Sequence, residues 1–526
     1  MAQSPQAHAE TLPANVGFDL TSRGATPIAQ TLYIFVKSGE HVQALFTKES
    51  IVSGTAANNG AIVLKSPTGW VSPTLTIDGT GSVGDTATLS GIPVATSDGI
   101  WELTITSNVN VPGGNLRINW DVGAYTAANA LIPGRVWTEK VEIIQWNMPG
   151  AADITLYNLN KEGYLYQSVF RQYNGVNSSF ITNAFGLTQN STCQPAYMST
   201  GIMVNPLSTD PSGYTPRSDC GGTFKIFFSN PSTAGLPASG DLPDGTTDWI
   251  MRPAVVPASI ANLAFTPTDI NAGMAGTVSA TLSDYAGHLT LLVDTNNNGV
   301  FTDPVDRTIE SSSNEGAWTF AFDGKDGTGA NIPARSSMKF RLLADRQGEI
   351  HFTRGDDELN AGGIEVNRLN GSSNSPTVLF WNDSQLQSNT CGTKTISPIN
   401  NSTTGTSSTG GVHGWDITGC VRPGGGTSNG NTNGDPAITN AAEYAAASSW
   451  GNMRYIDDWT YDLGAVLAEL TFNYVPPATP AVPATPTLAK TGGNEVLSIV
   501  TAAGILALAA AFYAHRRFLH TTTFRR

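Results

Sequence analysis

Short runs in which apolar and polar residues alternate, or in which β-branched residues gather, constrain the fold of this chain more than any other feature. Examples are "TLYIFVKSG", "TLTIDG", "WELTIT" and "LRINWDVG", each followed or preceded by Gly, Asn or Pro. Alternation with a period of two places one set of side chains on one face of a strand. Charged residues make up only 13% of the sequence, and the 55 Gly and 30 Pro disfavour long helices. We therefore expect an all-β protein.

The strand-like runs fall into four groups, which we interpret as immunoglobulin-like or other β-sandwich domains in tandem. The predicted domains cover residues 13–135, 136–255, 256–349 and 350–475. The third has about the length of an immunoglobulin-like domain. Four domains also agree with the chain length, because single cores stop growing well below 526 residues.

Residues 1–12 precede the first predicted domain and contain no apolar segment. Ala7, His8 and Ala9 have the small-x-small pattern of a signal-peptidase site. We interpret residues 1–12 as a remnant, the end of a signal peptide, and expect the start of the chain to be truncated or misassigned.

The four cysteines form two closely spaced pairs, Cys193 with Cys220 and Cys391 with Cys420. No CxxC spacing indicates a metal or redox site. In an oxidising compartment each pair could close a local loop, in the second and the fourth predicted domain respectively. Four buried free thiols are the alternative interpretation.

The C-terminal part of the chain has a different character. Residues 476–487, "PPATPAVPATPT", predict an extended polyproline II stalk. Residues 496–514 carry no charge, and a helix of that length, at ~1.5 Å per residue, about matches the hydrocarbon core of a membrane. Arg516 and Arg517 follow, and the positive-inside tendency leaves everything upstream outside the cell. A buried core helix is the alternative to this transmembrane helix.

A polar pentapeptide stands directly before the apolar run: Leu488, Ala489, Lys490, Thr491, Gly492. Pentapeptide, span and basic residues in this order resemble the cell-wall sorting signal of Gram-positive surface proteins, whose usual form is LPxTG. The resemblance covers residues 488–526.

This resemblance implies that a membrane-bound sortase recognises the pentapeptide and cleaves between Thr491 and Gly492. The enzyme would then join the threonyl carbonyl to an amine of the peptidoglycan precursor. Ala489 replaces the usual proline, and the LAxTG variant is associated with high-GC Gram-positive bacteria, which leaves the sortase class open. A permanent single-pass anchor is the alternative.

One loop has the composition of a cation site. In "DTNNNGVFTDPVD", oxygen atoms at alternating positions suit Ca²⁺, a hard ion that takes six to eight such ligands. The loop departs from an EF-hand because its twelfth position is Val305. A plain Asn-Gly hairpin is the alternative to a structural Ca²⁺. The predicted ligands are Asp294, Asn296, Asn298, the Val300 carbonyl, Asp303 and Asp306.

Aromatic residues and acids are concentrated in "GNMRYIDDWTYDLGA", residues 451–465. We interpret Tyr455, Trp459 and Tyr461 as core residues of a strand; an exposed surface for carbohydrate or protein is the alternative. The adjacent acids Asp457 and Asp458 would point to opposite faces of a strand, which does not suit a pair of catalytic carboxylates.

The remaining histidines and the Arg-Gly-Asp triplet give little support to a specific activity. His41 and His288 lie in the first and third predicted domains and His351 and His413 in the fourth, and we interpret all four as structural or surface residues. The triplet at residues 354–356 has the form of an integrin-binding peptide, but three residues recur by chance.

The charge balance limits the partners. Asp and Glu number 42 against 28 Lys and Arg, a net charge of −14, so we expect no nucleic-acid partner. No GxSxG, HExxH or phosphate-binding loop occurs, and we predict that the chain is not an enzyme.

These observations predict a secreted surface protein, anchored to peptidoglycan and acting in adhesion or surface display. Its partners would be a sortase, peptidoglycan, an unknown protein or glycan ligand, and the membrane through the tail before processing. The alternatives are a hydrolase acting on polysaccharide or peptide, which needs two facing carboxylates in one pocket, and a purely structural coat protein.

Overall fold

The computed structural model describes most of the chain as far as residue 477. The described residues are 10–12, 17–19, 29–48, 60–77, 82–107, 117–144, 152–174, 178–189, 193–202, 214–216, 220–232, 235–252, 254–357, 359–371, 377–386, 388–391, 394–415, 451–462 and 464–477. Within these ranges every regular element is a strand and no helix occurs, which confirms the predicted all-β class.

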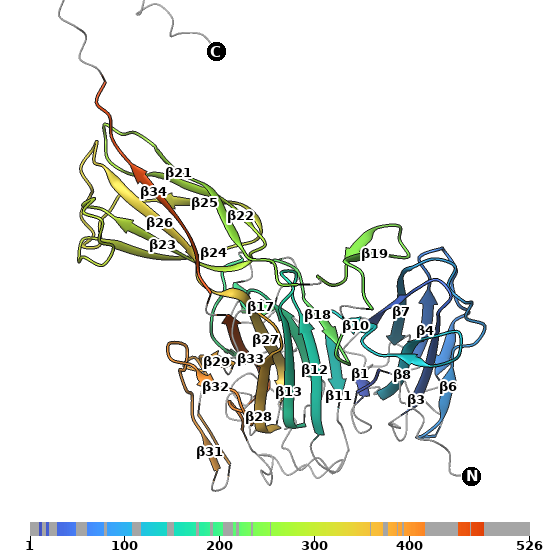
Figure 1. The fold of residues 1–526 in the computed structure, drawn as a ribbon. Helices are drawn as coiled ribbons and strands as arrows, with labels where there is room; N and C mark the ends of the chain where they lie inside the picture. The colour runs from blue at the N-terminus through green and yellow to red at the C-terminus, as the bar shows by residue number, and fades with distance from the viewer. Residues whose placement is uncertain are drawn as a thin grey trace, which may run out of the picture. The chain divides into compact units, whose positions relative to one another are not determined.

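Two extended antiparallel sheets contain most of the described strands (Figure 1). In the described part of the chain, the larger sheet has twelve strands. Ten of them follow the order β32 (Thr406–Ser407), β29 (Val378–Trp381), β33 (Gly451–Asp462), β27 (Gln347–Asp357), β14 (Ser178–Asn183), β11 (Val141–Ile144), β1 (Gly17–Asp19), β8 (Arg117–Tyr125), β3 (His41–Lys48) and β6 (Thr86–Thr88). The other two pair at its sides, β16 (Thr200–Ile202) with β33 and β9 (Leu131–Ile132) with β8.

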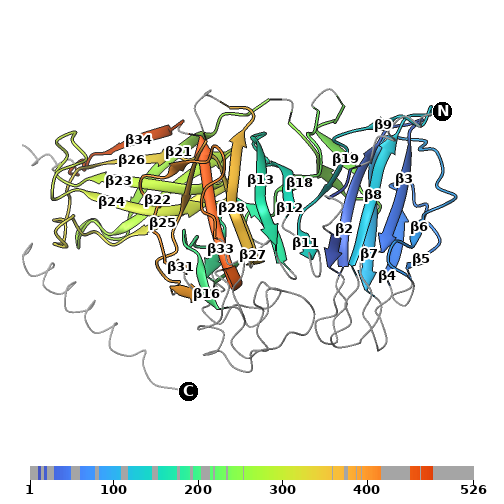
Figure 2. The same ribbon diagram turned by 90° about the horizontal axis from the view of Figure 1, so that it is seen from below.

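The second extended sheet has nine strands among the described residues. Their order is β28 (Leu359–Arg368), β13 (Leu165–Asn174), β12 (Ala152–Leu159), β18 (Lys225–Phe227), β10 (Val136–Thr138), β2 (Ala29–Val36), β7 (Gly99–Ser107), β4 (Gly60–Lys65) and β5 (Leu75–Ile77). Figure 1 shows β12, β13 and β28 as neighbours in this sheet, and Figure 2 shows β3 beside β8 in the larger one.

Alternating side chains of both extended sheets meet in one hydrophobic core. Leu32 and Ile34 on β2 belong to the same buried cluster as Val42 and Phe46 on β3, although β2 and β3 lie in different sheets. The burial pattern of β3 alternates along its whole length, as the sequence predicts for a strand with one face on a core. Burial of each such side chain stabilises the fold by about 1.5–3 kcal/mol.

A smaller two-layer sandwich has its own core. One layer is β21 (Ser259–Pro267), β22 (Gly276–Ser283) and β25 (Gly316–Phe322); the other is β24 (Arg307–Ser313), β23 (Gly287–Asp294), β26 (Met338–Ala344) and β34 (Val466–Phe472). Strand β34 joins this sandwich although more than a hundred residues separate it from β26, with which it pairs over all seven residues. Its Phe472 lies 5.2 Å from Phe265 between ring centroids.

The sheets do not follow the predicted domain boundaries. The boundary at 135/136 runs through the second extended sheet, because β10 pairs with β2. In the same way β27 pairs with β14 and β28 pairs with β13, across the boundaries at 255/256 and 349/350. The sandwich at 256–349 is completed by β34 from the range predicted as the fourth domain. The predicted domains follow the order of the strands in the sequence, whereas the sheets form by pairing between strands that are distant in the sequence.

Three two-stranded sheets complete the described elements: β15 (Leu187–Gln189) with β17 (Tyr214–Pro216), β19 (Ser239–Asp241) with β20 (Thr247–Trp249), and β30 (Asn389–Cys391) with β31 (Lys394–Ile396).

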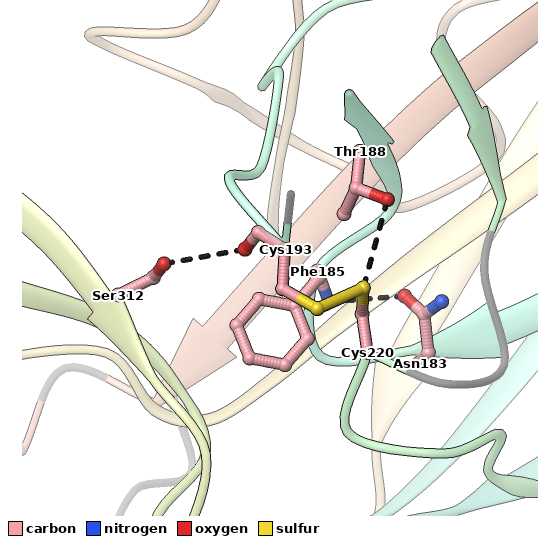
Figure 3. Close-up of a disulfide and its surroundings, with 6 residues drawn as sticks. All are labelled: Asn183, Phe185, Thr188, Cys193, Cys220 and Ser312. Carbon is pink, nitrogen blue, oxygen red and sulfur yellow. Dashed lines mark hydrogen bonds between the residues drawn. A yellow bond between two sulfur atoms is a disulfide. The ribbon is translucent and has the colours of Figure 1, made fainter. Parts of the chain in front are cut away.

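One of the two predicted disulfides is present. Cys193 and Cys220 are bonded, with their Cα atoms 5.3 Å apart (Figure 3). The Thr188 hydroxyl donates a hydrogen bond to the Cys220 sulfur at 3.9 Å, and the Ser312 hydroxyl donates to the Cys193 carbonyl at 3.5 Å. The partner predicted for Cys391, Cys420, lies outside the described residues.

The predicted tail also lies outside the described residues, apart from Pro476 and Pro477 at the start of the proline tract. This holds for the pentapeptide at 488–492 and for the apolar run at 496–514. None of the described segments forms a helix long and apolar enough to cross a membrane.

Candidate functional site

A polar cavity of about 470 Å³ is the strongest candidate for a functional site among the described residues. Residues from the smaller sandwich, from the segment after Cys193 and from the larger sheet line it. They include Tyr197, His288, Glu310, Asp345, Arg346 and Trp459. None of these six was predicted as a site residue.

Strand β27 carries apolar side chains on one face and polar side chains on the other, and the polar face supplies the residues beneath this cavity. Ile350 and Phe352 belong to the hydrophobic core, so alternation places Glu349, His351 and Thr353 on the opposite face. All five side chains are buried.

The imidazole of His288, on β23, lies between two carboxylates of the same cavity. Its Nδ1 atom is 3.1 Å from Oδ1 of Asp345, and its Nε2 atom pairs with the carboxylate of Glu310 on β24. Burial by itself lowers the pKa of His288, but the hydrogen bonds to Asp345 and Glu310 outweigh burial and raise the pKa to about 9. The same contact with His288 lowers the pKa of Glu310. His288 is therefore a cation at neutral pH.

Glu349 connects the cavity to the strand below it. Its carboxylate accepts hydrogen bonds from the His288 backbone N–H at 3.0 Å, from the Tyr197 hydroxyl at 2.9 Å and from Arg346 Nη1 at 3.2 Å. Burial raises the pKa of this carboxyl, but His351, whose Nε2 atom is 3.7 Å away, and the charges of Arg346 and His288 lower it to about 2. Glu349 is thus a buried anion whose hydrogen bonds hold the segment around Tyr197 and the start of β23 in place.

His351 and Trp459 form the next layer, directly opposite each other in the pairing of β27 with β33. Their rings stack with centroids 5.6 Å apart. The Nδ1 atom of His351 lies 2.9 Å from Oδ2 of Asp457, and Thr353 donates a hydrogen bond to Oδ1 of the same carboxylate at 3.1 Å. Burial lowers the pKa of His351, but Asp457 and Glu349 raise it to about 9.

The neighbouring acid, Asp458, contacts a different set of residues. It pairs with Arg354 and with His413, whose other ring nitrogen lies 2.8 Å from Asp383. Burial lowers the pKa of His413, but Asp458 and Asp383 raise it to about 9. Asp457 and Asp458 thus bind separate partners, as the alternation of strand side chains predicts.

The Arg-Gly-Asp triplet lies within β27. The Arg354 side chain is 2% exposed and holds Asp357 at 3.3 Å in addition to Asp458. A ligand cannot reach this guanidinium without opening the sheet, so the structure does not support integrin binding through it. The core interpretation of Tyr455 and Trp459 is confirmed, since they are 3% and 1% exposed, whereas Tyr461 is only partly buried.

The cavity has two carboxylates, Glu310 and Asp345, but their environment differs from that of a glycosidase pair. Such a pair needs one carboxyl with a raised pKa, so that it can donate a proton to the leaving group. Here His288 occupies the space between the two groups and lowers the pKa of Glu310. The arrangement is suited to holding fixed charges in place.

Hydrogen bonds among its own residues hold the predicted calcium loop. The buried Asp294 carboxylate accepts hydrogen bonds from the backbone N–H groups of Asn298 at 3.1 Å and Gly299 at 2.7 Å. The amides of Asn296 and Asn298 both donate to Oδ2 of Asp303. Asp306 accepts from the backbone N–H groups of Thr295 and Asp303.

This donor set consists of oxygen atoms, which is the chemistry that Ca²⁺ requires. Within the described residues, no group of three His, Cys, Asp or Glu side chains is placed to hold a metal ion. The calcium site therefore stays a prediction.

Sequence reasoning missed the cluster around His288 because its members are far apart in the chain. His288 and Asp345 are 57 residues apart, and His351 and Asp457 are 106 residues apart. The only local signal was the density of acids and aromatics in residues 451–465.

Fold and site together define the class: an all-β protein of antiparallel sheets with a network of ion pairs buried beside a polar cavity. Comparison of the chain with protein-family models and with the curated proteins finds no match to either.

Proposed function

We propose that this chain is a surface protein that a sortase attaches covalently to peptidoglycan through Thr491. The observation that carries the proposal is the order of the C-terminal segments: proline tract, LAKTG pentapeptide, uncharged run and Arg516-Arg517. Each part has a role in sorting, since the span holds the pentapeptide beside a membrane enzyme and the arginines keep the C-terminus in the cytoplasm.

Two features of the fold support an extracellular location. The Cys193–Cys220 disulfide belongs to an oxidising compartment. The smaller sandwich of seven strands, in layers of three and four, also has the size of an immunoglobulin-like domain, and we propose that it is one. Its last strand, β34, ends at Phe472, directly before the proline tract.

We also propose that the loop at 294–306 binds Ca²⁺ weakly and stabilises the turn between β23 and β24. Its ligands would be the six predicted groups, five of which already lie in one hydrogen-bonded loop. The ion would add only structural support, because this loop supplies no reacting group.

Cell fractionation of a matched pair of proteins tests the anchoring. The chain is produced in a Gram-positive host behind that host's secretion signal, both as wild type and as Thr491→Ala. We expect muramidase to release the wild type from the wall, whereas the variant stays with the membrane. Equal distribution of both proteins in the membrane fraction would contradict the proposal.

A further inference from the structure

The cavity beside His288 has the size of a ligand site, since such sites commonly enclose about 300–1,000 Å³, and this one measures about 470 Å³. It is built from three separate parts of the chain: the segment after Cys193, strands β23 and β24 with the turn after β26, and residues of the larger sheet. The Cys193–Cys220 disulfide fixes the first of these parts next to Ser312 on β24.

The charged groups around the cavity are paired with one another, and three carboxylates face two cations. His288 is held by Glu310 and Asp345, and Arg346 is held by Glu349. An anionic ligand would meet this excess of carboxylates and would be repelled. The cavity therefore selects against anions, and its carboxylates can accept hydrogen bonds from a neutral, polar ligand.

The polar groups of the lining can both donate and accept hydrogen bonds. Hydroxyl groups come from Thr290, Ser311 and Ser402, and an amide comes from Asn382. The Thr290 hydroxyl donates to Glu310 and Asp345, and the Ser402 hydroxyl donates to Asn400, so these two groups offer a ligand their acceptor lone pairs. The carboxylates of Glu310 and Asp345 have further lone pairs beside the ones that His288 uses. A hydroxyl-rich ligand matches such a lining, because each hydroxyl donates one hydrogen bond and accepts others.

Aromatic and apolar residues supply the remaining wall. Tyr197 and Trp459 pack edge to face, with ring centroids 5.3 Å apart, and Pro195 and Ala196 also line the cavity. Trp459 is 1% exposed, and among the described residues its indole N–H has no hydrogen-bond partner. The Trp459 ring itself is covered by the stacked rings of His351 and Phe380. The apolar surface open to the C–H groups of a sugar ring therefore comes from Pro195, Ala196 and the accessible part of Tyr197.

Tyr197 shows a further sign of a built site. Its φ is 47°, a left-handed conformation that a residue with a bulky side chain rarely adopts. The hydrogen bond to Glu349 and the Arg346 guanidinium, 4.5 Å from the ring centroid, hold the side chain there. Glu349 and Arg346, which form an ion pair beside the cavity, thus maintain this strained backbone conformation of Tyr197.

We propose that this cavity binds a neutral carbohydrate unit, such as one or two pyranose rings of a larger glycan. This inference rests on the proposed function in one respect: it names the class of ligand that the surface protein would bind. Binding by the purified chain does not require anchoring, so the two proposals can fail separately.

The test is isothermal titration of the full chain with a panel of neutral sugars, glucose, galactose, mannose, N-acetylglucosamine and lactose, and with N-acetylneuraminic acid as the anionic comparison. Ser402→Trp places a large side chain in the cavity wall. Ser407→Trp, on the exposed strand β32, is the matched control. Thermal unfolding of all three proteins verifies that they are folded.

We expect at least one neutral sugar to bind the wild type, with affinity reduced at least about tenfold, or about 1.4 kcal/mol, in Ser402→Trp and unchanged in Ser407→Trp. Three results would overturn the proposal: binding of no neutral sugar, binding of N-acetylneuraminic acid alone, or equal affinity in the wild type and Ser402→Trp.

Discussion

Nδ1 of His288 lies 3.1 Å from Oδ1 of Asp345, although the two residues are 57 positions apart in the chain. His288 is on β23 and Asp345 directly follows β26, so the pairing of these two strands brings the residues together. This contact joins the charge network beneath the cavity to the smaller sandwich.

Removing the Asp345 charge should lower the pKa of His288. In the Asp345→Asn variant we expect the pKa to fall from about 9 toward the ordinary value of 6.5, because one of two neighbouring anions is lost. Titration of the imidazole by NMR measures it. Asp153→Asn, an exposed acid on β12, is the control and should leave the pKa of His288 unchanged. An unshifted pKa in Asp345→Asn would show that Asp345 does not hold the imidazolium.

Stability should fall as the pH rises from 6.5 to 9. In the folded chain the pKa values of His288, His351 and His413 are about 9, above the ordinary 6.5. Their ion pairs therefore stabilise the fold fully below pH 6.5, and this stabilisation is lost as the pH rises through 9.

The measurement is the free energy of unfolding by denaturant at several pH values in this window. Burial raises the pKa of Glu10 and of Glu162 to about 7, from 4.5, so these groups add a decline between pH 4.5 and 7. Stability that is constant or increases between pH 6.5 and 9 would contradict the buried imidazolium network.

Loss of the Cys193–Cys220 disulfide should destabilise the chain by about 3 kcal/mol, since the bond closes a loop of moderate length. The double variant Cys193→Ser/Cys220→Ser should therefore unfold at a lower denaturant concentration than the wild type. A reducing agent should lower the midpoint of the wild type and leave that of the variant unchanged. If reduction affects both proteins equally, the bond is not the source of the stability.

Calcium should raise the thermal unfolding midpoint of the wild type relative to a sample with chelator, at ion concentrations of ~10⁻⁴ to 10⁻³ M. Asp303→Asn removes a predicted ligand charge and should abolish this shift. Asp326→Asn, in a different exposed loop, should retain it. Identical midpoints with and without calcium in the wild type would favour the plain hairpin.

Strand β34 should be essential for the smaller sandwich. A chain that ends at residue 465 lacks β34, which pairs with β26 and contributes Leu470 and Phe472 to the core. We expect it to be cleaved by proteases within residues 258–344, whereas a chain that ends at residue 477 should resist as well as the full chain. Equal resistance of both truncated chains would show that the sandwich closes without β34.

The sequence predicted the class of the fold because strand alternation is a local property. Residues 29–36, rich in aromatic and β-branched side chains, form β2, and residues 99–107, which include "WELTIT", form β7. The sheets themselves depend on partners such as β2 and β10, whose pairing joins residues about a hundred positions apart. Nothing local in the sequence specifies that choice, so the predicted boundaries fell inside sheets.

The same reason explains the outcome for the candidate sites. The loop at 294–306 is a contiguous motif and could be read directly from the chain. The cavity requires Tyr197, His288, Asp345 and Trp459 to meet, and each of them looks unremarkable in its own segment. Only the pairing of β27 with β33 and of β23 with β26 brings their chemistry together.

Mass spectrometry of muramidase digests of the cell wall tests covalent anchoring, the central claim, most directly. We expect a C-terminal peptide that ends at Thr491 and carries a peptidoglycan fragment on the threonyl carbonyl. An intact peptide that crosses the bond between Thr491 and Gly492 in the mature protein would contradict it.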